Sequence, residues 1–171
     1  MEEDLMENIL DALRKSVVFQ KLTNEQVKKL ATIAAVETHP VGTLLYKEGD
    51  PASKFYVVVA GKVVLDMKCE MGPLFPPRQV TVDVITKGES MGWSAVVDPY
   101  IFTMSCLCID ETRLVAVDAV KLREFIAQDC ELGFEIMKAV AKLIATRLTH
   151  TRVLLIGERA LGSMTEQTQY A

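Results

Sequence analysis

Side chains that could bind a metal or act as nucleophiles are few and scattered in this chain of 171 residues. The four cysteines and two histidines are Cys69, Cys106, Cys108, Cys130, His39 and His150. No two cysteines form a CxxC pair, and a zinc site needs nitrogen or sulfur ligands at recurring spacings. We therefore expect no metal and no cofactor, and we expect the cysteines to be buried thiols in a reducing cytosol.

Catalytic patterns are also missing from the sequence. We find no serine, histidine and aspartate in a triad order and no paired carboxylates within one element. These arrangements supply the nucleophile and the acid–base groups of most hydrolases. We expect that the protein is not an enzyme.

Charge and hydropathy restrict the partners further. The net charge is −4 and Lys and Arg do not cluster, which disfavours direct binding to nucleic acid, because affinity for DNA comes mainly from neutralising phosphates. No apolar stretch reaches the ~20 residues of a membrane span. The N-terminus is acidic and amphipathic, unlike a secretory signal. These features predict a cytoplasmic protein with no membrane contact.

The hydrophobic pattern divides the chain into helical, alternating and again helical parts. The boundaries are 1–35 for an N-terminal helical segment, 36–118 for a β domain, 119–156 for C-terminal helices and 157–171 for a flexible tail. Helices are expected at 3–15 and from Thr23, the N-cap of a capping box with Gln26, to about Ala35.

The alternating part predicts about eight short strands at roughly ten-residue spacing, typical of a barrel or sandwich. The expected strands include 55–60, 63–67, 80–85, 106–109 and 112–118. Residues 70–78 hold three prolines and are expected to form a loop.

The last third is expected to hold a short helix capped by Asp118 and a long helix from Glu131 to about Ile156. A helix of about 25 residues is about 38 Å long, more than one small barrel covers. A second copy of the same helix is the simplest cover for the remaining apolar face, which predicts a homodimer.

Several motifs resemble those of cyclic nucleotide-binding domains of the bacterial catabolite activator type. They are Gly42, the Glu-Gly-Asp-Pro-Ala turn at 48–52, the run at 55–63 and Gly88-Glu89, and the resemblance covers about 17–156. It implies an α+β fold that is mainly β: an eight-stranded antiparallel β-roll, or double-stranded β-helix, flanked by N-terminal helices and a long C-terminal helix.

The resemblance also implies a ligand site between the sixth and seventh strands, here residues 91–105. In ligand-binding members a Phe-Gly-Glu run opens a short helix, and a Pro-Arg-x-Ala-Thr run closes the loop and binds the cyclic phosphate. Gly92 and Ala95 keep the backbone shape, but Trp93 stands in the glutamate position and Phe102 in the arginine position. No Lys or Arg occurs between 87 and 113, so no shift of register restores a cation. The backbone amides and the hydroxyl groups of Ser94, Thr103 and Ser105 remain as donors that could hold an anion weakly.

On the long helix, members of this type carry a Thr-Ser pair that reaches the ligand base. Thr151 takes the threonine position, and Arg152 takes the serine position, from which it would bring a cation from the partner subunit. Thr151 and Arg152 have an alternative interpretation as ordinary residues of the helix face. The full set of candidate ligand-binding residues is Gly92, Trp93, Ser94, Ala95, Phe102, Thr103, Thr151 and Arg152.

A DNA-binding motif follows the long helix in activators, whereas only a short tail follows here. The sequence therefore predicts a stand-alone regulatory or sensor domain that does not bind cyclic AMP or cyclic GMP in the usual way. Its aromatic residues either form a pocket for an unidentified small molecule or fill the space. Two alternatives stay open: a dimeric module with a filled pocket that binds a protein partner, and a genuine but weak cyclic-nucleotide binder.

Overall fold

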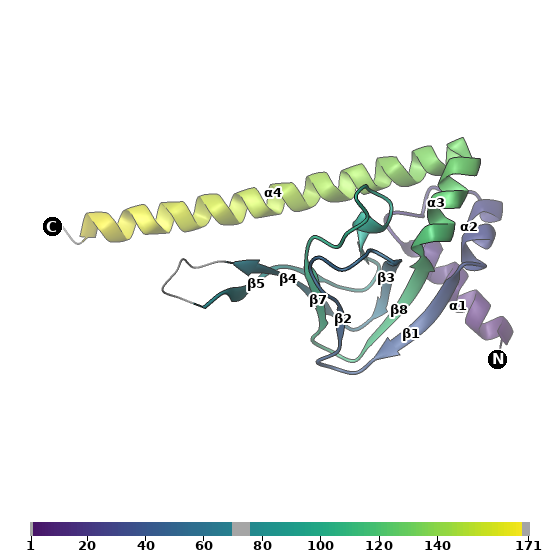
Figure 1. The fold of residues 1–171 in the computed structure, drawn as a ribbon, viewed down its shortest axis with the longest axis horizontal. Coiled ribbons are helices and arrows are strands. Elements are labelled where there is room, and N and C mark those ends of the chain that lie inside the picture. Colours follow the sequence, from purple (N-terminus) through teal and green to yellow (C-terminus); the bar gives the residue numbers. More distant parts are fainter. Residues whose placement is uncertain (1, 70–75, 169–171) are drawn as a thin grey trace.

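The computed structural model describes residues 2–69 and 76–168. In these ranges two helices precede eight strands, and two further helices follow (Figure 1). The strands form two four-stranded antiparallel sheets, in the orders β1-β8-β3-β6 and β2-β7-β4-β5. This arrangement confirms the predicted α+β fold built on an eight-stranded β-roll.

The strands are short, as their spacing in the sequence predicts. Their bounds are β1 Ala34–His39, β2 Leu44–Tyr46, β3 Lys54–Ala60, β4 Val63–Cys69, β5 Arg78–Ile85, β6 Ser90–Met91, β7 Ser105–Cys108 and β8 Thr112–Asp118. The loop predicted at 70–78 lies mostly outside the described residues, and Arg78 already belongs to β5.

Two of the helices, α2 and α3, begin where their capping residues place them. The bounds of the helices are α1 Glu2–Lys15, α2 Asn24–Ala31, the short 3₁₀ helix η1 Trp93–Ala95, α3 Ala119–Gln128 and α4 Cys130–Thr168. Thr23 and Gln26 form the predicted capping box of α2. Asp118 caps α3 by accepting a hydrogen bond from the Lys121 amide, also as predicted.

Strand β3 is buried on both of its faces and joins the helices to the interior of the roll. Successive side chains of a strand point to opposite faces. Phe55 meets Phe19 edge-on, with ring centroids 5.3 Å apart. The next residue, Tyr56, faces the other way and stacks toward Tyr46 of the second sheet. The core therefore continues from the N-terminal helices through the first sheet into the roll.

The predicted end of the second helix, at about Ala35, was wrong. Helix α2 ends at Ala31, and β1 begins at Ala34 and pairs with β8 along its whole length. The β-branched residues Thr32 and Ile33 lose rotamer freedom in a helix. The ladder of hydrogen bonds to β8 then outweighs the helix propensity of the two alanines that follow.

The predicted end of the long helix, at about Ile156, was also wrong. Helix α4 continues to Thr168 and extends beyond the roll (Figure 1). The segment after Ile156 loses its apolar periodicity but contains no proline, and a helix that is already nucleated propagates easily through such residues. Apolar periodicity indicates which part of a helix is packed against other residues. The helix itself continues past the end of that pattern.

The expectation of buried cysteines holds for only two of the four. Cys106 and Cys108 are buried in β7, whereas Cys69 and Cys130 are exposed at the end of β4 and the start of α4. Burial raises the pKa of Cys106 to about 12, so this thiol stays protonated. In the described part of the chain, no helix combines the length and apolar character needed to cross a bilayer.

Gly61, in the turn between β3 and β4, gives a direct test of this packing. Its φ is +82°, and an added Cβ would lie 2.3 Å from the Glu111 carbonyl oxygen. Gly42 has a similar φ of +84° but no heavy atom within 4 Å of an added Cβ. We expect Gly42→Ala to lower the free energy of unfolding by about 1–2 kcal/mol from backbone strain alone. Gly61→Ala should cost at least about 3 kcal/mol because a clash adds to that strain.

Urea unfolding followed by circular dichroism measures both variants. Equal losses of stability for the two would contradict the close approach of the Gly61 and Glu111 backbones.

Candidate functional site

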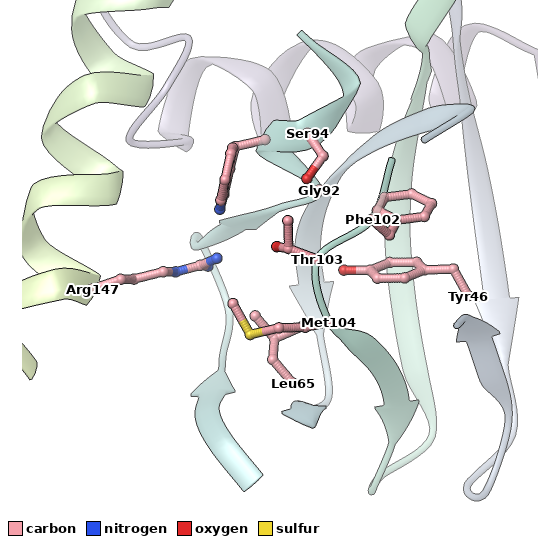
Figure 2. Close-up of a pocket in the computed structure, with 9 residues that line it drawn as sticks. Tyr46, Leu65, Gly92, Ser94, Phe102, Thr103, Met104 and Arg147 are labelled. Atoms are coloured by element: carbon pink, nitrogen blue, oxygen red, sulfur yellow. The ribbon is translucent and has the colours of Figure 1, made fainter. Parts of the chain in front are cut away.

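A small cavity lies inside the roll, where η1 and the loop before β7 face helix α4 (Figure 2). Its volume is about 10 Å³, roughly the space that one water molecule occupies. The residues that line it are Tyr46, Leu65, Gly92, Trp93, Ser94, Phe102, Thr103, Met104 and Arg147.

Gly92 shapes one wall of the cavity by opening η1 in a left-handed conformation, with a φ of +78°. An added Cβ would lie 3.0 Å from the Lys54 carbonyl oxygen and 3.3 Å from the Phe102 ring. A glycine is therefore needed here both for the backbone angle and for the close contact with Phe102.

Aromatic rings occupy most of the space beside Gly92. The rings of Phe102 and Tyr46 stack with centroids 3.7 Å apart, and Tyr46 and Tyr56 stack at 5.9 Å. All three residues are buried. Burial raises the pKa of both tyrosines, so their phenols remain uncharged inside the roll.

The cation of the site comes from α4. The Arg147 guanidinium points toward the cavity (Figure 2), donates from Nη2 to the Ser90 carbonyl oxygen at 2.8 Å, and lies 3.3 Å from Asp83 through Nε. Its side chain is only 13% exposed. Burial lowers the pKa of Arg147, and the nearby carboxylate of Asp83 acts in the opposite direction.

Two hydroxyl groups face the same space. Ser94 is 4% exposed, and the Thr103 hydroxyl points toward Arg147 in Figure 2. Neither side chain makes a hydrogen bond to any residue that the structure describes. No buried side-chain nitrogen or oxygen of the described residues lacks a hydrogen-bond partner, so these two hydroxyls are open to the cavity and not sealed in the core. A bound molecule can reach them there as donors and acceptors.

A second arginine, Arg123 of α3, is bonded to η1. It donates from Nη1 to the Ala95 carbonyl oxygen at 2.7 Å. Its guanidinium also lies over the ring of Tyr100, 4.3 Å from the centroid. The backbone between β6 and η1 is thus bonded to α3 through Ala95 and to α4 through Ser90.

A larger cleft of about 170 Å³ adjoins the cavity between α4 and β5. The two spaces share the lining residues Trp93, Met104 and Arg147. The other residues that line the cleft are Val82, Asp83, Ile144, Leu148, His150 and Thr151.

The structure brings together five of the eight candidate residues at the cavity: Gly92, Trp93, Ser94, Phe102 and Thr103. Ala95 is fully buried in η1 behind them. Thr151 lines the adjoining cleft, and its hydroxyl donates to the Arg147 carbonyl oxygen at 3.0 Å. Arg152 is exposed and lines neither space.

Sequence reasoning missed four lining residues: Tyr46, Leu65, Met104 and Arg147. For Arg147 a signal was present, because it lies four residues before Thr151 and residues at that spacing share one face of a helix. The cation expected from this helix was Arg152, which is exposed, whereas the cation that reaches the cavity is Arg147, five residues earlier.

Comparison with known proteins places the chain in a family. The family model described as cyclic nucleotide-binding domain matches residues 36–129, more than half of the chain. The chain belongs to the cyclic nucleotide-binding domain family. The match runs from β1 to the end of α3 and includes the cavity-lining residues of η1 and of the loop before β7.

Individual relatives of this domain are distant. The chain is 24% identical over 132 residues to a CRP-like cAMP-activated global transcriptional regulator of Mycobacterium tuberculosis, covering 77% of this chain and 57% of the regulator. The chain therefore spans little more than half the length of this relative.

Solved structures show the same fold. The N-terminal domain of a transcriptional regulator from Streptomyces coelicolor has a TM-score of 0.63 and 28% identity, covering 80% of this chain and 94% of that one. A cyclic nucleotide-binding domain from Methylobacillus flagellatus has a TM-score of 0.73 and 20% identity, covering 91% and 85%.

The stacked ring of Phe102 is expected to carry much of the local stability. Phe102→Ala removes a ring that is 4% exposed, and we expect a loss of about 3–5 kcal/mol in the free energy of unfolding. Its neighbour Ile101 is 43% exposed, so Ile101→Ala should cost less than about 1 kcal/mol. Chemical denaturation of the two variants measures the difference, and a similar small loss for both would show that the stack with Tyr46 is not a structural contact.

Proposed function

We propose that this member of the cyclic nucleotide-binding family is a regulatory domain that does not bind cyclic AMP or cyclic GMP in the usual way. The observation that carries the proposal is the stack of Phe102 on Tyr46, which leaves a cavity of about 10 Å³ at the family's ligand position. Small-molecule pockets usually enclose about 300–1,000 Å³. A cyclic nucleotide fits there only if buried rings move.

The electrostatics of the site support the same proposal. By its resemblance to the family, the chain has Trp93 and Phe102 where a glutamate and an arginine hold the nucleotide. Each charged hydrogen bond contributes about 1.5–3 kcal/mol, so the loss of two weakens binding by about two to four decades. Arg147 is a poor substitute because it is already held by Asp83 and the Ser90 carbonyl oxygen.

Calorimetric titration with cyclic AMP and cyclic GMP tests this proposal. We expect no saturable heat for either nucleotide up to about 1 mM, because both charged contacts are missing and the rings fill the site. A dissociation constant tighter than about 10 μM for either nucleotide would contradict the proposal.

A variant that restores the family residues provides the matched control. Trp93→Glu combined with Phe102→Arg should bind cyclic AMP at least about tenfold more tightly than the unmodified chain, since it regains two charge-assisted contacts. Circular dichroism checks that this double variant is folded.

Helix α4 supports a second part of the proposal, pairing with another copy of the chain. From about its middle, α4 exposes large apolar side chains: Leu148, at the edge of the cleft, is 48% exposed, Val153 is 64% exposed and Ile156 is 68% exposed. Apolar residues on a long helix that leaves its own domain are usually covered by another helix. A second copy supplies the same surface and closes a two-fold dimer.

The dimer can be broken by a charge on that surface. Ile156→Glu should shift the molecular mass measured by light scattering from dimer to monomer, because a carboxylate would be buried between the helices. Val120→Glu places the same change on α3, at a side chain that is 54% exposed, and should leave the mass unchanged. A chain that is monomeric before any substitution would contradict the pairing.

A further inference from the structure

The cavity and the adjoining cleft together form an amphipathic site. The inner cavity presents Arg147 and the hydroxyls of Ser94 and Thr103, whereas the cleft is mainly apolar, with Val82, Ile144 and Leu148 among its walls. Because the two spaces share Trp93, Met104 and Arg147, a molecule in the cleft reaches the polar groups of the cavity.

Arg147, Ser94 and Thr103, which line the inner cavity, retain hydrogen-bonding groups that are not bonded to the protein. The Ser94 hydroxyl lines the cavity and is not a buried unsatisfied group, so it is open to a molecule in that space. A guanidinium has five N–H donors, and the contacts to Asp83 and to Ser90 use only Nε and one donor of Nη2. A donor-rich end of this kind fits an oxygen atom that accepts hydrogen bonds.

The charges around the site decide whether that oxygen belongs to an anion or to a neutral group. Asp83 lines the cleft and lies 3.3 Å from Arg147, so the one guanidinium at the site is already neutralised. Glu89 is a further carboxylate close enough to act on Arg147. A carboxylate ligand would therefore face Asp83 without a free cation, whereas a carbonyl or hydroxyl oxygen would not.

We propose that the site between α4 and β5 binds an uncharged small molecule with an apolar body in the cleft and one hydrogen-bond-accepting oxygen at Arg147, Ser94 and Thr103. The cleft volume of about 170 Å³ is below the range of about 300–1,000 Å³ that is usual for drug-sized ligands, which favours a small body. The inference rests on the proposed function, because a cyclic nucleotide bound at the same position would exclude such a molecule.

Trp93 makes the site observable. It is the single tryptophan of the chain, and it lines both the cavity and the cleft. Its indole N–H therefore gives one unambiguous cross-peak in a ¹H–¹⁵N spectrum of the full chain. Titration with cyclohexanone and with cyclohexanecarboxylate compares a neutral and an acidic probe of nearly the same shape. Both titrations are run at the same pH, so that His150, which also lines the cleft, is in the same state for the two probes.

We expect cyclohexanone to shift the Trp93 indole peak saturably, and cyclohexanecarboxylate to bind at least about tenfold more weakly. Asp83→Asn should reverse or abolish the preference for the ketone over the acid. The substitution removes the carboxylate that pairs with Arg147, so the guanidinium can pair with an anionic ligand. Glu124→Gln removes a carboxylate from an exposed position on α3 and serves as the matched control, with no change in either titration.

Arg147→Lys tests the donor itself. It keeps the charge but loses the planar fork, so it should weaken cyclohexanone binding by about tenfold while the spectrum stays that of a folded protein. The inference is overturned if neither probe gives a saturable shift, if the acid binds as well as the ketone, or if Asp83→Asn leaves the preference unchanged. Failure of the proposed function is seen separately, as tight binding of cyclic AMP or cyclic GMP in the calorimeter.

Discussion

The stacked rings of Tyr56, Tyr46 and Phe102 are the contact on which the rest of this structure depends. Tyr56 belongs to the first sheet, Tyr46 to the second, and Phe102 to the loop that closes the candidate site. One continuous stack therefore joins both sheets of the roll to that loop. Aromatic pairs contribute about 0.5–1.5 kcal/mol beyond the area they bury, so this stack stabilises the core and shapes the cavity together.

Much of the fold could be predicted from the sequence because local signals and tertiary structure agree. Alternating apolar residues gave most of the strands, and the capping residues Thr23 and Asp118 marked the starts of two helices. The error at the end of α2 falls where a long-range contact decides. Pairing with β8 drew Ala34 and Ala35 into a strand, and nothing local announces that pairing.

The candidate site was predictable only in part for a related reason. The resemblance to the family pointed to Trp93, Ser94, Phe102 and Thr103, which are neighbours in sequence and lie together in the structure. Arg147 is more than forty positions away and reaches the cavity only because α4 packs beside η1 and β5. The motif at residues 91–105 shows that the site has no local cation. It does not show that the fold brings the guanidinium of Arg147 there from α4.

The two arginines that hold the backbone around η1 have a mechanical consequence. Arg123 of α3 donates a hydrogen bond to the Ala95 carbonyl oxygen, and Arg147 of α4 donates one to the Ser90 carbonyl oxygen. Helices α3 and α4 also contact each other directly. The segment between these two points is thus clamped at both ends by one helical pair. A displacement of α4 relative to the roll would pull on the backbone on both sides of Gly92, and a change in the contents of the cavity would push on the helices through the same two bonds. Two hydrogen bonds therefore connect the backbone beside the cavity to the pair of helices α3 and α4.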